Sequence, residues 1–361
     1  MKNLKKQVSA LCVSIALTLS VLPMTVLGAE NDAASVSFGE STQNYATIDD
    51  AWAAAIACET TAENKATVKL LADCKAENTL TDTDDYLVLD TNGKTLTTPD
   101  AQYPASTVAC GIGVEGGSLE IIGNGKISGI SSASFSRAIL SVTGGAVYAN
   151  GVTIHNTGAN GSIAVRVNGG EFRLLDGYLL SNSEYALSAD SGKVYLYSGK
   201  IESTGRLAMS ANEHSLDVQI CYSDKPLYFV DNDKDNNWAL ISSMWRVHLE
   251  DNVIADVEYS DNPDGSNSTT LKSVTEIAAE ANSDRNYLKI QTYKQSNLFD
   301  TSSEDGFLDR IKTDGVTNIS ADAFTAVHFV DLADHDLTNV QYSDYSASDD
   351  GSVKAWADGT E

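Results

Sequence analysis

The sequence predicts an all-β protein: a parallel β-helix, or solenoid, with an N-terminal capping helix and a partial β-rich region at its C-terminal end. One phrase, a glycine followed by alternating apolar residues, a glycine turn and a second short strand, occurs four times. The copies start at Gly117, Gly145, Gly170 and Gly192, which are 28, 25 and 22 residues apart. Within residues 111–205 lie 18 of the 26 glycines. A repeat of roughly twenty residues with strands too short to stand alone is typical of one solenoid coil.

The stretch "YLVLDTNGKTLT", residues 86–97, shows the same phrase before the first repeat. Asn92-Gly93 fits either a hairpin turn or a solenoid corner, because both require positive φ. The in-phase repeats and the unequal polar insertions between them favour a corner.

Strand alternation predicts which side chains face the core. The inward positions are expected to stack as aliphatic columns. They are Leu119, Ile121, Ile127, Val147, Ala149, Val152, Ile154, Phe172, Leu174, Tyr178, Leu180, Val194, Leu196 and Ile201. Asn156 and Asn182 each lie five residues after the second glycine of their coils, so we expect them to stack at one corner.

An amphipathic helix is predicted just before the first coils. Thr47 can act as its N-cap, with Asp50 three residues later. Its apolar positions fall on one face, and they are Ile48, Ala51, Trp52, Ala55 and Ile56. Such a helix can cover the open end of a solenoid.

The first 29 residues predict a secretory signal peptide. Lys2, Lys5 and Lys6 precede an apolar run over residues 8–27, which ends in the small pair Gly28-Ala29. We expect a secreted, extracellular chain without membrane insertion after cleavage, and a flexible N-terminal segment over residues 30–44.

The charge restricts the possible partners. The net charge of −26 becomes −29 once the three signal-peptide lysines are removed. Such an acidic surface repels nucleic acid and anionic membrane, although it can attract divalent cations.

Four cysteines remain after processing, and their spacing matches no metal or redox motif. Cys58 and Cys74 lie close enough in sequence for a disulfide in an oxidising compartment, whereas buried free thiols are the alternative.

The layout of signal peptide, "YATIDDAWAAA" helix, "ATVKLLAD" strand and glycine-punctuated coils resembles secreted surface proteins of Gram-positive bacteria built on the right-handed parallel β-helix, the pectate-lyase-like superfold. The resemblance covers about residues 45–205 and implies the handedness of the coil. Its motifs indicate the fold and contain no catalytic residue.

The glycine rhythm fades beyond residue 215. We expect the β-helix with its cap to span residues 45–260, and a linker over 261–315 to contain a helix ("LKSVTEIAAEANS") and a strand ("NYLKIQTYK"). Residues 316–361 are expected to start an incomplete β-rich C-terminal domain.

A calcium site is a minor possibility, and no other cofactor is expected. Asp231, Asp233 and Asp235 have the spacing of an oxygen-ligand calcium loop. The sixth position is Asn236 instead of glycine, and the twelfth is Ser242 instead of glutamate, so a plain polar turn is the favoured interpretation.

The main candidate site is an outward-facing column. Glu120, Tyr148, Arg173 and Tyr195 each lie three residues after a coil's first glycine, and Tyr197 lies two residues further on. Sugars can stack on exposed aromatic rings while polar side chains bind their hydroxyls. Cross-strand packing of tyrosines is the structural alternative.

The composition and motifs favour a non-catalytic, adhesin-like surface protein that binds carbohydrate or an extracellular host protein. A polysaccharide lyase or glycoside hydrolase of the same superfold is the enzymatic alternative, and a passive surface stalk is the third. Arg310-Ile311-Lys312 is similar to the substrate-binding tripeptide of polygalacturonases, but that family's paired-aspartate and Gly-His-Gly motifs are missing.

Overall fold

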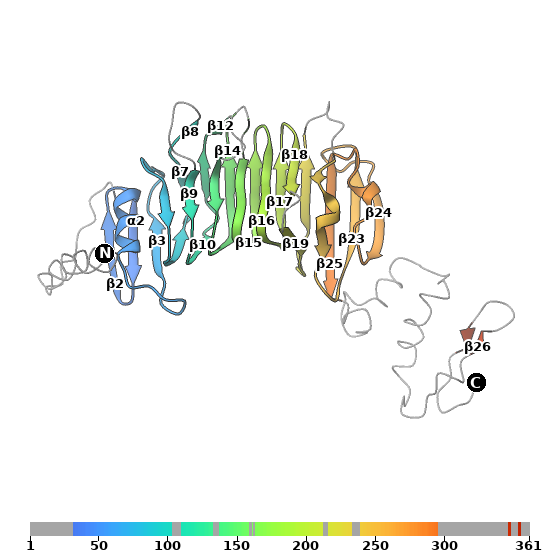
Figure 1. Ribbon diagram of the computed structural model, residues 1–361, viewed down its shortest axis with the longest axis horizontal. Helices are drawn as coiled ribbons and strands as arrows, with labels where there is room; N and C mark the ends of the chain where they lie inside the picture. Colours follow the sequence, from blue (N-terminus) through green and yellow to red (C-terminus); the bar gives the residue numbers. More distant parts are fainter. Residues whose placement is uncertain are drawn as a thin grey trace, which may run out of the picture. The chain divides into compact units, whose positions relative to one another are not determined.

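The computed structural model describes residues 32–102, 110–132, 137–158, 161, 163–211, 216–232, 239–294, 346–347 and 353–354. A parallel β-solenoid of about 6 turns forms the main unit, as the sequence predicts. Its strands stack in chain order from β3 to β20, and one helix lies at the N-terminal end (Figure 1). The parallel strand pairs form three stacks, here called sheets I, II and III, which make up the faces of the solenoid.

Sheet I follows the first strand of each repeat phrase. Its members are β3 (Ala66–Leu70), β6 (Tyr86–Asp90), β10 (Ser118–Ile122), the start of β14 (Ala146–Asn156), the middle of β15 (Ile163–Ser181), the end of β16 (Tyr185–Leu196), β19 (Leu216–Ile220) and β22 (Val247–Leu249). All of these strands pair in parallel.

Sheet II follows the second strand of each phrase. It contains β4 (Cys74–Lys75), β7 (Thr95–Thr97), β11 (Lys126–Gly129), the ends of β14 and β15, β17 (Gly199–Ser203) and β20 (Leu227–Asp231). Sheet III contains β5 (Leu80–Asp82), β9 (Cys110–Val114), β13 (Ala138–Val142), the starts of β15 and β16, β18 (Leu207–Ala211) and β21 (Ile241–Ser242). A small pair, β8 (Ala101–Gln102) with β12 (Ser131–Ser132), lies apart from these sheets.

The Asn92-Gly93 stretch is a corner, as predicted. Its flanking strands β6 and β7 pair with the strands of neighbouring coils and not with each other. Asn92 and Gly93 have φ values of 49° and 71°.

The aliphatic columns are confirmed in most coils. Leu119, Ile121, Val147, Phe172 and Val194 are among the fully buried core residues. Two predicted inward positions are wrong: Tyr178 and Leu180 are only half-buried, and Leu179 faces the core instead.

The unequal spacing of the glycines causes this error. Gly177 lies seven residues after Gly170, whereas Gly151 lies six residues after Gly145. β14 pairs with β15 at the same offset of 25 residues before and after a local irregularity, so Val152, and not Gly151, lies opposite Gly177. Positions counted from the second glycine of the third coil therefore fall one residue too late, on the other face of the strand.

The N-terminal cap is helix α2 (Ile48–Ile56). The Thr47 hydroxyl accepts a hydrogen bond from the Asp50 backbone N–H at 3.1 Å, which confirms the N-cap. Trp52 is buried, and its indole N–H donates to the Thr81 carbonyl at 3.0 Å, which ties the helix to the first coil.

Residues 30–44 were expected to be flexible, but most of this segment is strand. β1 (Ala34–Phe38) and β2 (Ser41–Tyr45) form an antiparallel hairpin, and β1 also pairs with β3 at the start of sheet I. The short alternation "ASVSF" was overlooked because it lies outside the repeat.

The region after the coils also differs from the prediction. The expected helix over residues 271–283 is instead the strand β24 (Thr269–Val274) followed by the 3₁₀ helix η2 (Ala279–Ala281). Strand β25 (Tyr287–Lys294) is present as expected, but it pairs antiparallel with β20, so it belongs to the solenoid and not to a linker. β24 pairs antiparallel with β23 (Val253–Ser260).

A second unit contains most of the C-terminal residues, of which the structure describes the short strands β26 (Ser346–Ala347) and β27 (Val353–Lys354). The predicted signal peptide, residues 1–29, and Arg310-Ile311-Lys312 lie outside the described residues. In the described part of the chain, no helix is long and apolar enough to cross a membrane.

Candidate functional site

The predicted column of outward side chains is present on sheet I. Glu120 pairs in register with Tyr148, Tyr148 with Arg173, and Arg173 with Tyr195. The column continues beyond the prediction through Gln219 to His248. We call these six residues the sheet I ladder. Strands in a sheet are about 4.8 Å apart, so the side chains follow one another closely along the solenoid.

Arg173 is the centre of the ladder. Its guanidinium carbon lies 5.7 Å from the ring centroid of Tyr148 and 4.5 Å from that of Tyr195, so the cation contacts both rings. Nε donates to Glu171 at 2.5 Å, and a terminal nitrogen donates to the Tyr197 hydroxyl at 3.3 Å. The hydrogen bond to Glu171 raises the pKa of Arg173 above its ordinary value, so the group stays charged.

The structure therefore brings together all four predicted ligand-binding residues, Tyr148, Arg173, Tyr195 and Tyr197. Their mutual contacts also limit how they can bind. The guanidinium occupies the space between Tyr148 and Tyr195, so a sugar cannot stack between these rings. The hydroxyls, the outer ring surfaces and the remaining guanidinium N–H groups are the parts that can meet a ligand.

Two carboxylates next to the ladder's aromatic rings are paired with cations. Glu120 forms an ion pair with Lys65, and Glu171 forms one with Arg173. Within each of these ion pairs the two charges cancel, although the chain as a whole has a net charge of −26. The face is thus suited to a neutral, hydroxyl-rich ligand better than to a strong cation or anion.

A second outward column lies on sheet II and was missed by the sequence analysis. It aligns Lys126, Thr153, Tyr178, Lys200, Tyr228 and Lys289 in register. The error at Tyr178 hid this column, because Tyr178 was placed in the core. Only a correct register for the third coil could have revealed it.

Glu202 organises the centre of this second column. Its carboxylate accepts a 2.5 Å hydrogen bond from the Tyr178 hydroxyl and contacts Lys200 and Asn232. Lys200 also lies over the ring of Tyr178, 5.4 Å from its centroid. Burial and the hydrogen bond to Glu202 raise the pKa of Tyr178. These contacts are internal to the surface and stabilise it.

The corner between sheets II and III contains a buried polar column. Asn156 pairs in register with Ser181, Ser181 with Ser203, and Ser203 with Asp231, and all four are buried. The predicted stack of Asn156 on Asn182 is therefore wrong by one residue, because both positions were counted from second glycines that do not pair with each other. Asn182 is exposed, and its side chain contacts His155 at 2.9 Å.

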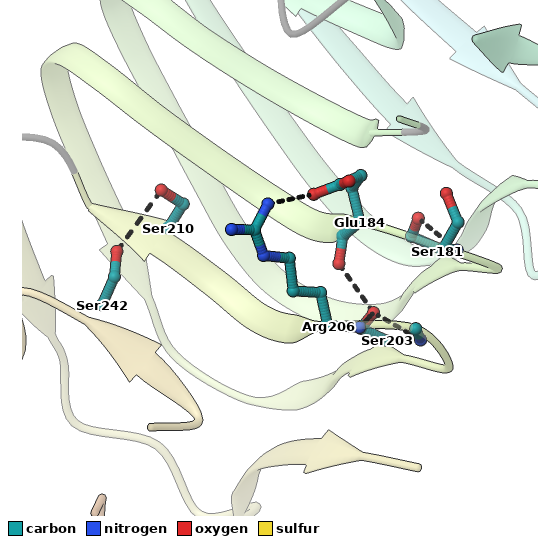
Figure 2. A network of polar contacts seen from close by, with 8 residues as sticks. Ser181, Glu184, Ser203, Arg206, Ser210 and Ser242 are labelled. Atoms are coloured by element: carbon teal, nitrogen blue, oxygen red, sulfur yellow. Dashed lines mark hydrogen bonds and ion pairs between the residues drawn. The ribbon is translucent and has the colours of Figure 1, made fainter. Parts of the chain in front are cut away.

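The corner side chains satisfy backbone groups of the turns. Asn156 donates to the Ile163 carbonyl at 2.7 Å and accepts from the Gly158 N–H at 2.9 Å. Ser203 donates to the Glu184 carbonyl at 2.7 Å, while Arg206 binds the Glu184 carboxylate at 3.0 Å (Figure 2). This corner is a structural network in which the polar groups are occupied by the chain itself.

The calcium prediction stays untested. Asp231 ends β20 and is buried at the corner, whereas Asp233 and Asp235 lie outside the described residues. Within the described residues, no cluster of three or more His, Cys, Asp or Glu side chains could hold a metal ion.

The predicted disulfide is not formed in this structure. Cys58 and Cys74 are both free thiols, as is Cys110. The Cys58 thiol donates to the Ala54 carbonyl at 3.4 Å. Burial raises the pKa of Cys74 to about 11, so this thiol is a poor nucleophile at neutral pH.

One carboxyl group stands out by its burial. Asp82 lies at the end of β5 and pairs in register with Val114 of β9. Its Oδ2 has no hydrogen-bond partner in the described part of the chain. Burial raises the pKa of Asp82 to about 7, and the charges of Asp85 and Asp84 add to this effect. Because Asp82 is in the interior, it is not accessible to a polymer substrate.

The fold and the surface define the class of protein: a parallel β-solenoid with two ordered side-chain columns. No protein-family model matches the chain, and comparisons with curated proteins and with solved structures give no match.

Proposed function

We propose that this is a secreted, non-catalytic surface protein that binds neutral glycans on sheet I. The sheet I ladder is the observation that supports this proposal most strongly. It holds tyrosines, an arginine, a glutamine and a histidine at regular spacing on one outward face. Glycans are recognised by such combinations of aromatic rings and hydrogen-bonding side chains.

The state of the carboxylates favours binding over catalysis. Glycoside hydrolysis requires two carboxyl groups in defined acid and base roles. On sheet I, Glu120 and Glu171 are engaged by Lys65 and Arg173. Both carboxylates thus contact neighbouring cations instead of forming an unengaged acid and base pair.

Secretion rests on the signal-peptide pattern of the first 29 residues, and a place at the cell surface rests on the resemblance to surface β-helix proteins. Calcium at Asp231, Asp233 and Asp235 would be an accessory feature. An extracellular protein is the other ligand class that such a face could bind.

The proposal is tested with a glycan array and the chain from Glu30 onward. We expect binding to neutral glycans, and a strong loss when Tyr148, Tyr195 and Tyr197 are all replaced by alanine. Circular dichroism and the melting temperature should show that the triple variant keeps its fold. Absence of binding to every glycan, or binding that survives the triple change, would refute the proposal.

A further inference from the structure

Trp245 is the most exposed large apolar side chain among the described residues, with 63% of its surface accessible. It lies in the 3₁₀ helix η1 (Met244–Arg246), at the corner between sheet III and sheet I in the last coil. Strand β22 follows directly, and it contains His248, the last residue of the sheet I ladder. The indole therefore lies three residues before the end of the ladder.

The turn that presents Trp245 is held firmly. Met244 packs against the core on one side of it, and Val247 is buried on the other. Ser243 has a left-handed conformation with φ 53° and ψ 46°, which is uncommon for a residue with a side chain. Strained backbone of this kind is concentrated at functional sites.

One face of the indole is already covered. The guanidinium carbon of Arg246 lies 3.9 Å from the Trp245 ring centroid, so the cation stacks on the ring. This contact fixes the orientation of the indole, and the high exposure of Trp245 requires that much of the remaining ring surface is open to solvent.

We propose that Trp245 is a stacking platform for one sugar ring of a neutral glycan, and that it anchors the glycan at the His248 end of the sheet I ladder. This inference rests on the proposed function. The apolar CH face of a pyranose can lie on the open indole face, while Arg246 and His248 offer polar groups for its hydroxyls.

A protein partner fits the same tryptophan less well. Binding hot spots of protein interfaces have a surrounding apolar region that excludes water. Ile56 is the one other exposed large apolar side chain in the described ranges, and it lies in α2 at the opposite end of the solenoid. Among the described residues, Trp245 thus has no second exposed large apolar side chain at its end of the solenoid. The net charge of −26 disfavours anionic polysaccharides.

The test is affinity electrophoresis of the chain from Glu30 onward in gels containing xylan, glucomannan, a mixed-linkage β-glucan or polygalacturonate. Three variants are compared with the wild type: Trp245→Ala, Trp245→Phe, and Ile56→Ala as the matched control for loss of an exposed apolar side chain. We expect at least one neutral polysaccharide to retard the wild type. Trp245→Ala should bind about tenfold more weakly, Trp245→Phe should lie in between, and Ile56→Ala should bind as the wild type.

The outcomes separate the two proposals. Retardation that persists in Trp245→Ala but is lost when Tyr148, Tyr195 and Tyr197 become alanine would overturn the role of Trp245 and leave the ladder as the glycan site. If none of the neutral polysaccharides retards the wild type, or if polygalacturonate alone does, the proposal that Trp245 binds a neutral glycan is refuted. A glycan array without any binding would overturn the proposed function as well. The melting temperature of Trp245→Ala should stay near that of the wild type, because the side chain is mostly exposed.

Discussion

Arg173 and Tyr195 lie opposite each other on neighbouring coils, and the guanidinium carbon of Arg173 is 4.5 Å from the Tyr195 ring centroid. This contact decides how sheet I can act. It restricts the motion of the tyrosine rings, and the guanidinium covers part of their surface. A ligand must then use hydroxyl groups and ring edges along the ladder and find its main stacking surface elsewhere.

Replacement of Arg173 by alanine should destabilise the solenoid moderately. The change removes two cation–π contacts and the hydrogen bonds to Glu171 and Tyr197. Cation–π contacts at exposed sites contribute about 0.5–1 kcal/mol each, so the expected loss in the free energy of unfolding is about 1–2 kcal/mol. Urea unfolding followed by circular dichroism measures it.

Lys193→Ala is the matched control for this change. Lys193 is exposed on the same sheet, on the strand next to that of Arg173. Its removal should change the free energy of unfolding by less than about 0.5 kcal/mol. Equal losses of unfolding free energy in the two variants would mean that the stacking of Arg173 between Tyr148 and Tyr195 adds nothing to stability.

The polar corner predicts a contrast between two asparagines. Asn156→Ala leaves the buried Ile163 carbonyl and the Gly158 N–H without the Asn156 side chain, which should cost about 2–4 kcal/mol of unfolding free energy. Asn182→Ala removes an exposed side chain and should cost below about 1 kcal/mol. Chemical denaturation of both variants provides the test, and a larger loss for Asn182 would contradict the register described here.

The first glycines of the coils should not tolerate a side chain. At Gly145 φ is +62°, and an added Cβ would lie 2.5 Å from the Gly116 carbonyl carbon. Gly145→Ala should lower the free energy of unfolding by at least about 2 kcal/mol, because strain and a backbone clash act together. Gly93→Ala, with φ +71° and no atom within 4 Å, should lose only about 1 kcal/mol. Thermal melts of both variants test this, and similar losses would argue against close stacking at Gly145.

Asp82 predicts an unusual pH dependence. Burial raises the pKa of its carboxyl to about 7 in the folded chain, above the value of about 3.9 expected when unfolded. The folded chain then binds more protons than the unfolded chain between these values, so Asp82 makes stability fall as the pH rises from about 4 to 7. The slope from this single group is at most about 1.4 kcal/mol per pH unit.

The variant Asp82→Asn isolates this effect. An asparagine keeps an acceptor for the Asp85 N–H but carries no charge. Melting temperatures between pH 4 and pH 8 should fall less steeply in the variant, which should be the more stable of the two above pH 7. Parallel curves for the wild type and the variant would show that Asp82 does not titrate in this range.

The repeat phrase contained enough information to predict the solenoid, its core columns and the alignment of Glu120, Tyr148, Arg173 and Tyr195. It failed where the glycine spacing departs from the strand pairing. The second glycine of the third coil, Gly177, lies one residue further along than in the coil before, so Tyr178 and Asn182 were counted one residue too late, although the strands pair at the same offset throughout.

Other features depend on contacts that a single sequence does not reveal. The apolar spacing of residues 271–283 suits a helix, but pairing with β23 makes residues 269–274 a strand. Trp245 lies in a turn of the last coil, outside every copy of the repeat, so the repeat pattern could not predict its exposure. In the structure, Met244 and Val247 pack towards the core, and Trp245 between them is exposed.

The most direct test of the central claim is calorimetric titration with the strongest neutral glycan from the array. Four proteins are compared: the wild type, the Tyr148→Ala, Tyr195→Ala and Tyr197→Ala triple variant, and Tyr228→Ala and Tyr178→Phe on the opposite sheet II column. If sheet I is the binding face, the triple variant binds at least about tenfold more weakly, while the two sheet II variants bind as the wild type. Unchanged affinity in the triple variant together with a loss in Tyr228→Ala would contradict the account and place the site on sheet II.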